Sequence, residues 1–152
     1  MSLQKGDKCP AFQLKNQFDQ IVDITDCLGK QNIVIFFYPK DETPGCTKEA
    51  CAFRDEFEEF LKYDCTVFGI SSDSVEKHLS FSKNHRLPYN LLADENKIVR
   101  KLFGVPGNLF GLIPGRVTYI INKEGTIEEV FNSQTNPLGH ISSALHTLKG
   151  LV

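Results

Sequence analysis

The sequence has no apolar run long enough to cross a membrane: its longest, Ile33 to Tyr38, holds six residues, and a spanning helix needs about 20. The N-terminus has no apolar segment of the kind that directs secretion. No block of lysine or arginine is longer than a pair and the formal charge is only −2, so a basic field for nucleic acid is missing. We therefore expect no membrane or nucleic acid partner and a cytoplasmic location, with a mature organellar form that has lost its transit peptide as the alternative.

Internal repeats, low-complexity tracts and linkers rich in Ser, Gly or Pro are also missing. Hydrophobic residues make up 41% and charged residues 24% of the 152 residues, which is ordinary globular composition with enough apolar material for a continuous core. A chain of this length has the commonest size for one folded unit. We expect residues 1–152 to form a single domain.

Strand and helix patterns alternate along the chain. Segments rich in β-branched and aromatic residues predict strands at 32–38, 65–70, 116–121 and 126–131. The first is apolar throughout, as in a central parallel strand covered on both faces, and the last two predict a hairpin. Helical patterns cover 44–62, 74–85, 96–103 and 137–149, the second opened by Asp73 and Glu76 in capping-box spacing. This order predicts an α/β thioredoxin-like fold, a central mixed β-sheet flanked by helices.

The sequence holds an odd number of cysteines, Cys9, Cys27, Cys46, Cys51 and Cys65. A chain of this size folds without a disulfide framework. We therefore expect reactive thiols for some of them and burial for the rest, because a free cysteine behaves as a small hydrophobe.

Cys46 follows the central strand at the point where the chain enters a helix, and ligands of open α/β sheets bind at that place. Thr43 is a good N-cap and Pro44 a favoured first helical residue. Cys46 then lies in the first turn, where unpaired N–H groups and the positive helix end favour a thiolate.

In a helix with this spacing, Cys46 and Cys51 lie on different faces. Cys46 shares the apolar face with Ala50, Phe53, Phe57 and Phe60, whereas Cys51 falls among charged positions, where packing explains it poorly. Five helical residues place the two Cα atoms roughly 8 to 9 Å apart, and a disulfide needs less than about 7 Å. If these two cysteines bond to each other, the first turns of the helix must unwind in each catalytic cycle.

The segment Pro39-x-x-x-Thr43-x-x-Cys46 resembles the peroxiredoxin active-site motif. Gly45-Cys46-Thr47-x-Glu49-x-Cys51 resembles the peroxiredoxin Q or bacterioferritin comigratory protein branch, whose resolving cysteine lies five residues after the peroxidatic one. The resemblance extends from about Lys5 through the C-terminal helix. It implies a thiol-dependent peroxidase that reduces hydrogen peroxide and organic hydroperoxides, is recycled by thioredoxin or a similar dithiol reductant, uses no metal or other cofactor, and is commonly a monomer.

The resemblance also implies a set of catalytic residues: Cys46 as the peroxidatic thiolate, Cys51 as its resolver, Thr43 as a hydrogen-bond donor to the peroxide, Pro39 as the shield of the pocket, Arg116 as the guanidinium over the thiolate, and Glu49 as the acid that orients this arginine. Taken without the resemblance, Arg116 is expected to be a solvated residue at a strand start, and Thr43 is equally well explained as a helix cap, a role that can coexist with the catalytic one. Cys9, Cys27 and Cys65 match no motif position, so packing is their expected role, with an alternative resolving partner among them left open.

Two other features have plainer interpretations. The histidines lack metal-ligand spacing, so we expect surface imidazoles at His78, His85, His140 and His146. The apolar segment 109–113 either borders the substrate pocket or a contact surface, or folds back onto the core.

Two rival functions remain open. A thioredoxin-like fold also hosts dithiol–disulfide oxidoreductases that act on proteins, although their usual Cys-x-x-Cys spacing is absent. In a non-catalytic module or holdase chaperone, the segment around Cys46 would be a coincidence. Stoichiometric peroxide consumption that is lost in Cys46→Ser would favour the peroxidase over both.

Overall fold

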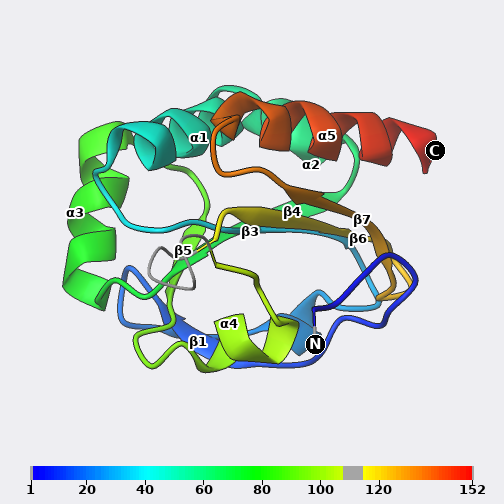
Figure 1. The fold of residues 1–152 in the computed structure, drawn as a ribbon, viewed down its shortest axis with the longest axis horizontal. Coiled ribbons are helices and arrows are strands. Elements are labelled where there is room, and N and C mark those ends of the chain that lie inside the picture. Colours follow the sequence, from blue (N-terminus) through cyan, green and yellow to red (C-terminus); the bar gives the residue numbers. More distant parts are fainter. Residues whose placement is uncertain (1, 108–114, 152) are drawn as a thin grey trace.

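The computed structural model describes residues 2–107 and 115–151, so the apolar segment 109–113 lies outside the described residues. Within these ranges a seven-stranded mixed sheet has the order β2-β1-β5-β4-β3-β6-β7 (Figure 1). The strands are β1 (Gln13–Asn16), β2 (Ile21–Asp23), β3 (Asn32–Phe37), β4 (Cys65–Ser71), β5 (Asn90–Ala93), β6 (Val117–Ile121) and β7 (Ile127–Asn132). The predicted α/β architecture and the β6–β7 hairpin are confirmed, and β1, β2 and β5 are additional.

Helices cover both faces of the sheet. They are α1 (Pro44–Asp55), α2 (Phe57–Lys62), α3 (Val75–His85), α4 (Ile98–Phe103) and α5 (Pro137–Gly150), with a 3₁₀ turn η1 (Ile24–Asp26). In Figure 1, α1, α2 and α5 lie on one side of the sheet and α4 lies on the other. Among the described residues no helix combines the length and the apolar character that crossing a membrane requires.

Strand β3 lies between β4 and β6 and carries the chain to the candidate site. It pairs parallel with β4 and antiparallel with β6, so the prediction of a parallel strand holds on one side only. All its residues are buried. Because successive strand side chains point to opposite faces, Phe36 enters the core under α1 and Phe37 the core over α4.

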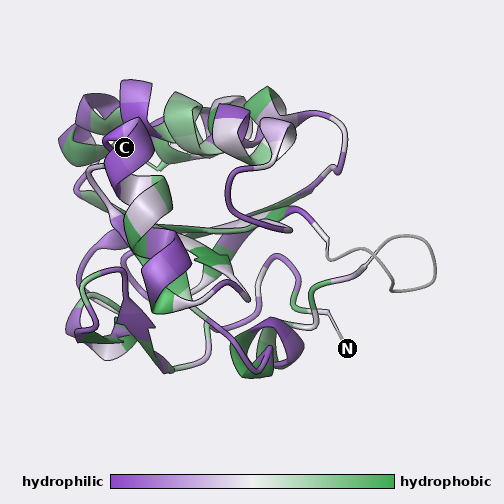
Figure 2. Ribbon diagram, turned by 90° about the vertical axis from the view of Figure 1, so that its left-hand side faces the viewer, coloured by the Kyte–Doolittle hydropathy of each residue, from purple (hydrophilic) through white to green (hydrophobic). Residues whose placement is uncertain are grey.

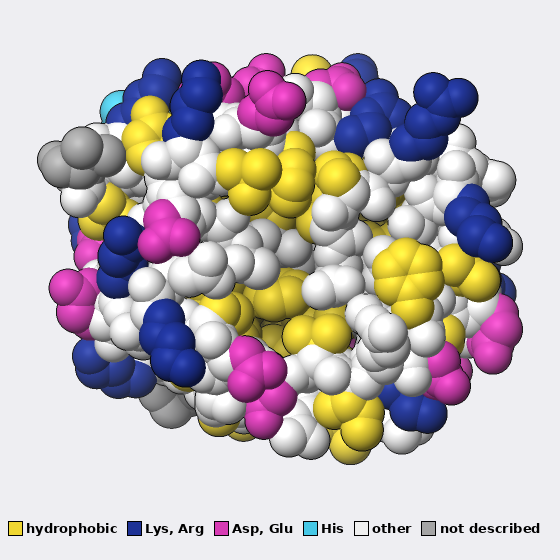
Figure 3. All heavy atoms as spheres, turned by 180° about the vertical axis from the view of Figure 1, so that it is seen from behind, with side chains coloured by type: hydrophobic (Ala, Val, Ile, Leu, Met, Phe, Trp, Pro, Cys, Tyr) yellow, Lys and Arg dark blue, Asp and Glu magenta, His cyan; other side chains and the backbone are white. Residues whose placement is uncertain are grey.

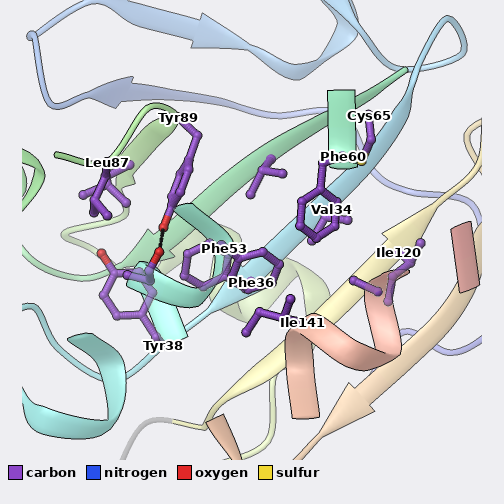
Figure 4. Close-up of a cluster of buried hydrophobic side chains, with 14 of the residues drawn as sticks. Val34, Phe36, Tyr38, Phe53, Phe60, Cys65, Leu87, Tyr89, Ile120 and Ile141 are labelled. Atoms are coloured by element: carbon purple, nitrogen blue, oxygen red, sulfur yellow. Dashed lines mark hydrogen bonds between the residues drawn. The ribbon is translucent and has the colours of Figure 1, made fainter. Parts of the chain in front are cut away.

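The core under α1 is rich in aromatic rings (Figure 4). Phe36 stacks on Phe53 of α1 with ring centroids 4.5 Å apart, and Tyr38 is 5.5 Å from Phe36. Figure 2 shows hydrophobic residues concentrated along the interior strands, while the helices carry both hydrophobic and hydrophilic residues. On the face shown in Figure 3, acidic and basic side chains alternate around hydrophobic patches, so neither charge sign dominates that face.

The ends of two predicted helices agree with the structure, but a break within one and the capping residue of the other were not predicted correctly. The helix expected over 44–62 breaks at Glu56, between α1 and α2. The break lets Phe60 stay fully buried while Phe57 turns toward Tyr89, at 6.3 Å between ring centroids. The N-cap of α3 is Ser74, whose side chain accepts from the Lys77 N–H, because the carboxylate expected to cap it, that of Asp73, accepts a backbone hydrogen bond from Asp41 instead.

Candidate active site

The candidate site begins where β3 ends and α1 starts. Pro44 is the first residue of α1, a position where the missing N–H of proline costs no helical hydrogen bond. Cys46 therefore lies in the first turn, as predicted, and its side chain is 1% exposed beside Tyr38 and Ala50 in the core under α1. A short local pattern thus places a buried thiol at the positive end of a helix.

Thr43 is the N-cap residue, but its side chain makes no capping hydrogen bond. Its hydroxyl instead donates to the carbonyl oxygen of Lys40 at 2.9 Å, so the expected side-chain cap is wrong. In this rotamer the hydroxyl oxygen is an acceptor. To donate to a peroxide, as the resemblance implies, the hydroxyl must turn away from Lys40.

Arg116 lies just before β6 and is buried, at 5% exposure, so the interpretation as a solvated strand residue is wrong. Its Nη1 donates to Glu49 Oε1 at 2.8 Å and its Nε to the carbonyl oxygen of Gln134 at 3.2 Å. Its Nη2 would lie 3.0 Å from a Cβ atom built on Gly45. The guanidinium therefore packs on the first turn of α1, one residue from Cys46.

Glu49 is fully buried and contacts Arg116 through only one carboxyl oxygen. Its Oε2 has no hydrogen-bond partner among the described residues, and the nearest ion-pair atom, His140 Nδ1, is 3.5 Å away. Burial raises the pKa of Glu49 to about 8 against the opposing effect of Arg116. Burial also lowers the pKa of His140 to about 4. Burial therefore opposes the ionisation of both groups, whereas the hydrogen bond from Arg116 favours the carboxylate form of Glu49.

The prediction of surface histidines is wrong for two of the four. His78 and His140 are fully buried, because both nitrogens of each ring have hydrogen-bond partners. His140 contacts Thr118 Oγ1 and the Ser133 carbonyl oxygen. His85 is half-buried and His146 is exposed.

His78 contacts Asp41 at 2.6 Å and the carbonyl oxygen of Leu92 at 3.0 Å. Together with Asp73 these side chains place three possible metal ligands within 4.8 Å of one another. Hydrogen bonds already account for the arrangement, because the Asp73 carboxylate accepts from Ser71 and from the Asp41 backbone.

The other cysteines divide as the sequence predicted. Cys51 is half-exposed on α1, whereas Cys9, Cys27 and Cys65 are buried. Burial raises the pKa of all three buried thiols, that of Cys9 to about 12, so these thiols resist ionisation. All five cysteines are free.

Sequence reasoning missed a second buried guanidinium. Arg100 of α4 is 9% exposed and donates to the carbonyl oxygens of Tyr38 and Gly115, both at 3.2 Å. Pro39, between Tyr38 and the rest of the loop, is half-buried. No local pattern distinguishes Arg100 from a solvated residue of a short helix.

Comparisons with known proteins agree with this geometry. The AhpC/TSA family matches residues 5–130. Peroxiredoxin Q, chloroplastic, from Sedum lineare is 49% identical over 147 residues, which cover 97% of this chain and 78% of that protein. The protein of the same name from Arabidopsis thaliana is 48% identical over 147 residues, with coverage of 97% and 68%.

Solved structures are similar over almost the whole chain. Peroxidoxin BcpB from Mycobacterium tuberculosis superposes with a TM-score of 0.91 at 36% identity, covering 99% of both chains. A cysteine-to-serine mutant of PrxQ from Xylella fastidiosa gives a TM-score of 0.90 at 28% identity, covering 99% of this chain and 98% of that one. The predicted thioredoxin-like fold is confirmed.

Proposed function

The chain belongs to the AhpC/TSA family and is a thiol peroxidase of the peroxiredoxin Q branch, and we propose that Cys46 is its peroxidatic thiolate and Cys51 its resolving thiol. The observation that carries this proposal is the buried Arg116 guanidinium on the first turn of α1. It brings a fixed positive charge to the helix end that holds Cys46.

Ionisation of the thiol does not by itself make a peroxidase. Lowering a thiol pKa from about 8.5 to about 6 raises the thiolate fraction at neutral pH about thirtyfold. The nucleophilicity of that thiolate falls about tenfold. The larger contribution must come from groups that align the peroxide and stabilise negative charge on the leaving oxygen, and Arg116 supplies such donors.

The proposed reaction has three steps. The Cys46 thiolate attacks one peroxide oxygen, so that an S–O bond forms, the O–O bond breaks, and the other oxygen leaves as an alcohol or water after taking a proton. The Cys51 thiol then attacks the sulfenic acid of Cys46, and water leaves as the S–S bond forms. A dithiol reductant, thioredoxin or a similar protein, reduces this disulfide and is itself oxidised.

The second step requires α1 to open. Cys46 is buried and Cys51 half-exposed on the same helix, and five residues of helix hold their Cα atoms too far apart for a disulfide. Opening breaks the contact of Glu49 with Arg116 and releases the hydrogen bond from Tyr89 to the Ala50 carbonyl oxygen. We propose that the turns from Pro44 to Cys51 unwind after Cys46 is oxidised.

Mass mapping after one equivalent of hydrogen peroxide tests this assignment. We expect a Cys46–Cys51 disulfide in the wild type, a stable sulfenic acid at Cys46 in Cys51→Ser, and no peroxide consumption in Cys46→Ser. Cys27→Ser is the matched control, because this buried thiol lies in the core on the other face of the sheet. Peroxide consumption that survives Cys46→Ser would contradict the proposal, and a disulfide to another cysteine would reassign the resolver.

The reductant, the assembly and the location are further parts of this proposal. Turnover with a thioredoxin system would support recycling by thioredoxin, and sedimentation would test the expected monomer. The two plant proteins named above are chloroplastic, which favours an organellar form as an alternative to the predicted cytoplasmic location.

A further inference from the structure

Arg100 joins two segments that are far apart in the sequence and that both lead into the site. Its Nη2 donates to the carbonyl oxygen of Tyr38, directly before Pro39, and its Nη1 to that of Gly115, directly before Arg116. One planar guanidinium thus spans the start of the loop to Cys46 and the backbone that carries Arg116. Its rigid fork suits two acceptors at once.

The charge of Arg100 is buried without a carboxylate ion pair among the described residues. The Asp94 carboxylate accepts the backbone N–H groups of Val99 and Arg100 rather than the guanidinium. The guanidinium carbon lies 5.6 Å from the ring centroid of Phe37, and the charge interacts electrostatically with Cys46. Burial of a positive charge costs free energy unless the charged group is hydrogen-bonded. The two hydrogen bonds to carbonyl oxygens therefore explain how the Arg100 guanidinium can remain buried.

We propose that Arg100 is a second positioning residue of the peroxidase site, which holds the segments before Pro39 and Arg116 at a fixed separation and adds positive charge near Cys46. The inference rests on the proposed role of Cys46. It adds to the site a residue of α4, which lies on the opposite face of the sheet from α1 (Figure 1).

Two substitutions separate the two effects. Arg100→Met removes the charge and both hydrogen bonds, whereas Arg100→Lys keeps the charge but has no fork to span two carbonyl groups. We expect Arg100→Met to slow the reaction of Cys46 with hydrogen peroxide about ten- to a hundredfold, as small displacements of reacting groups do. It should also shift the pH profile of Cys46 alkylation to higher pH. Arg100→Lys should lose part of the rate and keep the wild-type pH profile.

The matched control is Lys101→Met, which removes the same charge from the adjacent, exposed position of α4. Stopped-flow measurements give the peroxide rate constant, and peptide mapping after iodoacetamide treatment gives the profile of Cys46. The other charged and titratable groups around the site include Tyr38, Asp41, Glu49, Asp94, Arg116, Tyr119 and His140. All of them remain in these variants.

The outcomes are distinct. A slower reaction and a shifted profile in Arg100→Met, with Lys101→Met unchanged, support the proposal. Wild-type rate and profile in Arg100→Met overturn it, as does an equal shift in Lys101→Met. If circular dichroism shows that Arg100→Met does not fold, the test uses Arg100→Lys instead. A wild-type rate constant in Arg100→Lys also overturns the proposal. If instead the wild type consumes no peroxide, or Cys46→Ser retains its activity, the proposed function fails.

Discussion

At the scale of single residues, Gly115 shows how closely two backbone segments approach each other at the site. A Cβ atom at this position would collide with the carbonyl oxygen of Pro106. The contact is with backbone, which cannot turn aside as a flexible side chain can. The next residue is Arg116, so a shift of this segment moves the guanidinium that packs on α1.

Gly115→Ala should therefore reduce peroxidase activity about tenfold or more and lower the free energy of unfolding by about 1 to 3 kcal/mol through overpacking. Stopped-flow kinetics and urea unfolding measure the two effects. Gly150→Ala is the control, because no atom lies within 4 Å of its added Cβ. Wild-type kinetics and stability in Gly115→Ala would mean that the close approach does not position Arg116.

At the scale of elements, α1 has to be stable enough to hold Cys46 and weak enough to open. In the described part of the chain two side-chain hydrogen bonds from other elements hold its first turns, the one between Glu49 and Arg116 and the one from the Tyr89 hydroxyl to the Ala50 carbonyl oxygen at 2.7 Å (Figure 4), and the side chains of Cys46, Glu49 and Ala50 are also buried. Phe53, farther along α1, stacks on Phe36. The hydrogen bonds that oppose opening are therefore identifiable, and they act together with the burial of these side chains.

Tyr89→Phe should make opening of α1 more frequent. Loss of one hydrogen bond is worth about 1 kcal/mol, which corresponds to about a fivefold change in the population of the open form. Amide exchange over residues 44–52 in the reduced protein, and the rate of disulfide formation after peroxide addition, should both increase. Tyr63→Phe removes the same atom at the C-terminal end of α2 and should change neither. Unchanged exchange in Tyr89→Phe would show that this bond does not restrain the helix.

At the scale of the whole molecule, the burial of Glu49 links stability to pH. Its pKa is about 8 in the folded protein against an ordinary value of 4.5, so the folded state binds more protons between these values. The stability that comes from keeping Glu49 protonated is fully present below about pH 4.5. It is lost as pH rises through about 8. The direction follows from burial, which outweighs the pairing with Arg116.

In Glu49→Gln, the free energy of unfolding should therefore lack the part of its pH dependence that comes from ionisation of Glu49. We expect the wild-type free energy of unfolding to fall relative to that of Glu49→Gln as pH rises from about 5 to about 9, as measured by urea unfolding. Glu58→Gln, at an exposed position of α2, should keep the wild-type slope. Parallel curves for the wild type and Glu49→Gln would show that this carboxyl is ionised throughout.

The sequence alone determined the features that depend on neighbours along the chain. The apolar run before Tyr38, the Thr43-Pro44 helix start and the helical spacing predicted where Cys46 and Cys51 lie relative to solvent. These are local properties, because backbone geometry and side-chain periodicity act over a few residues. The strands β1, β2 and β5 escaped prediction because each holds only three or four residues, too few to show a clear period, and because β5 pairs with strands that are distant in the sequence.

Which polar side chains are buried depends on contacts between distant parts of the chain. Arg116 and Glu49 are 67 residues apart, and Arg100 and Tyr38 are 62 apart. Burial of a polar group is favourable only when partners satisfy its hydrogen bonds, and here those partners come from other elements. For this reason the sequence predicted a surface imidazole at His140 and gave no sign of Arg100, whereas the fold encloses both and brings them to the site around Cys46.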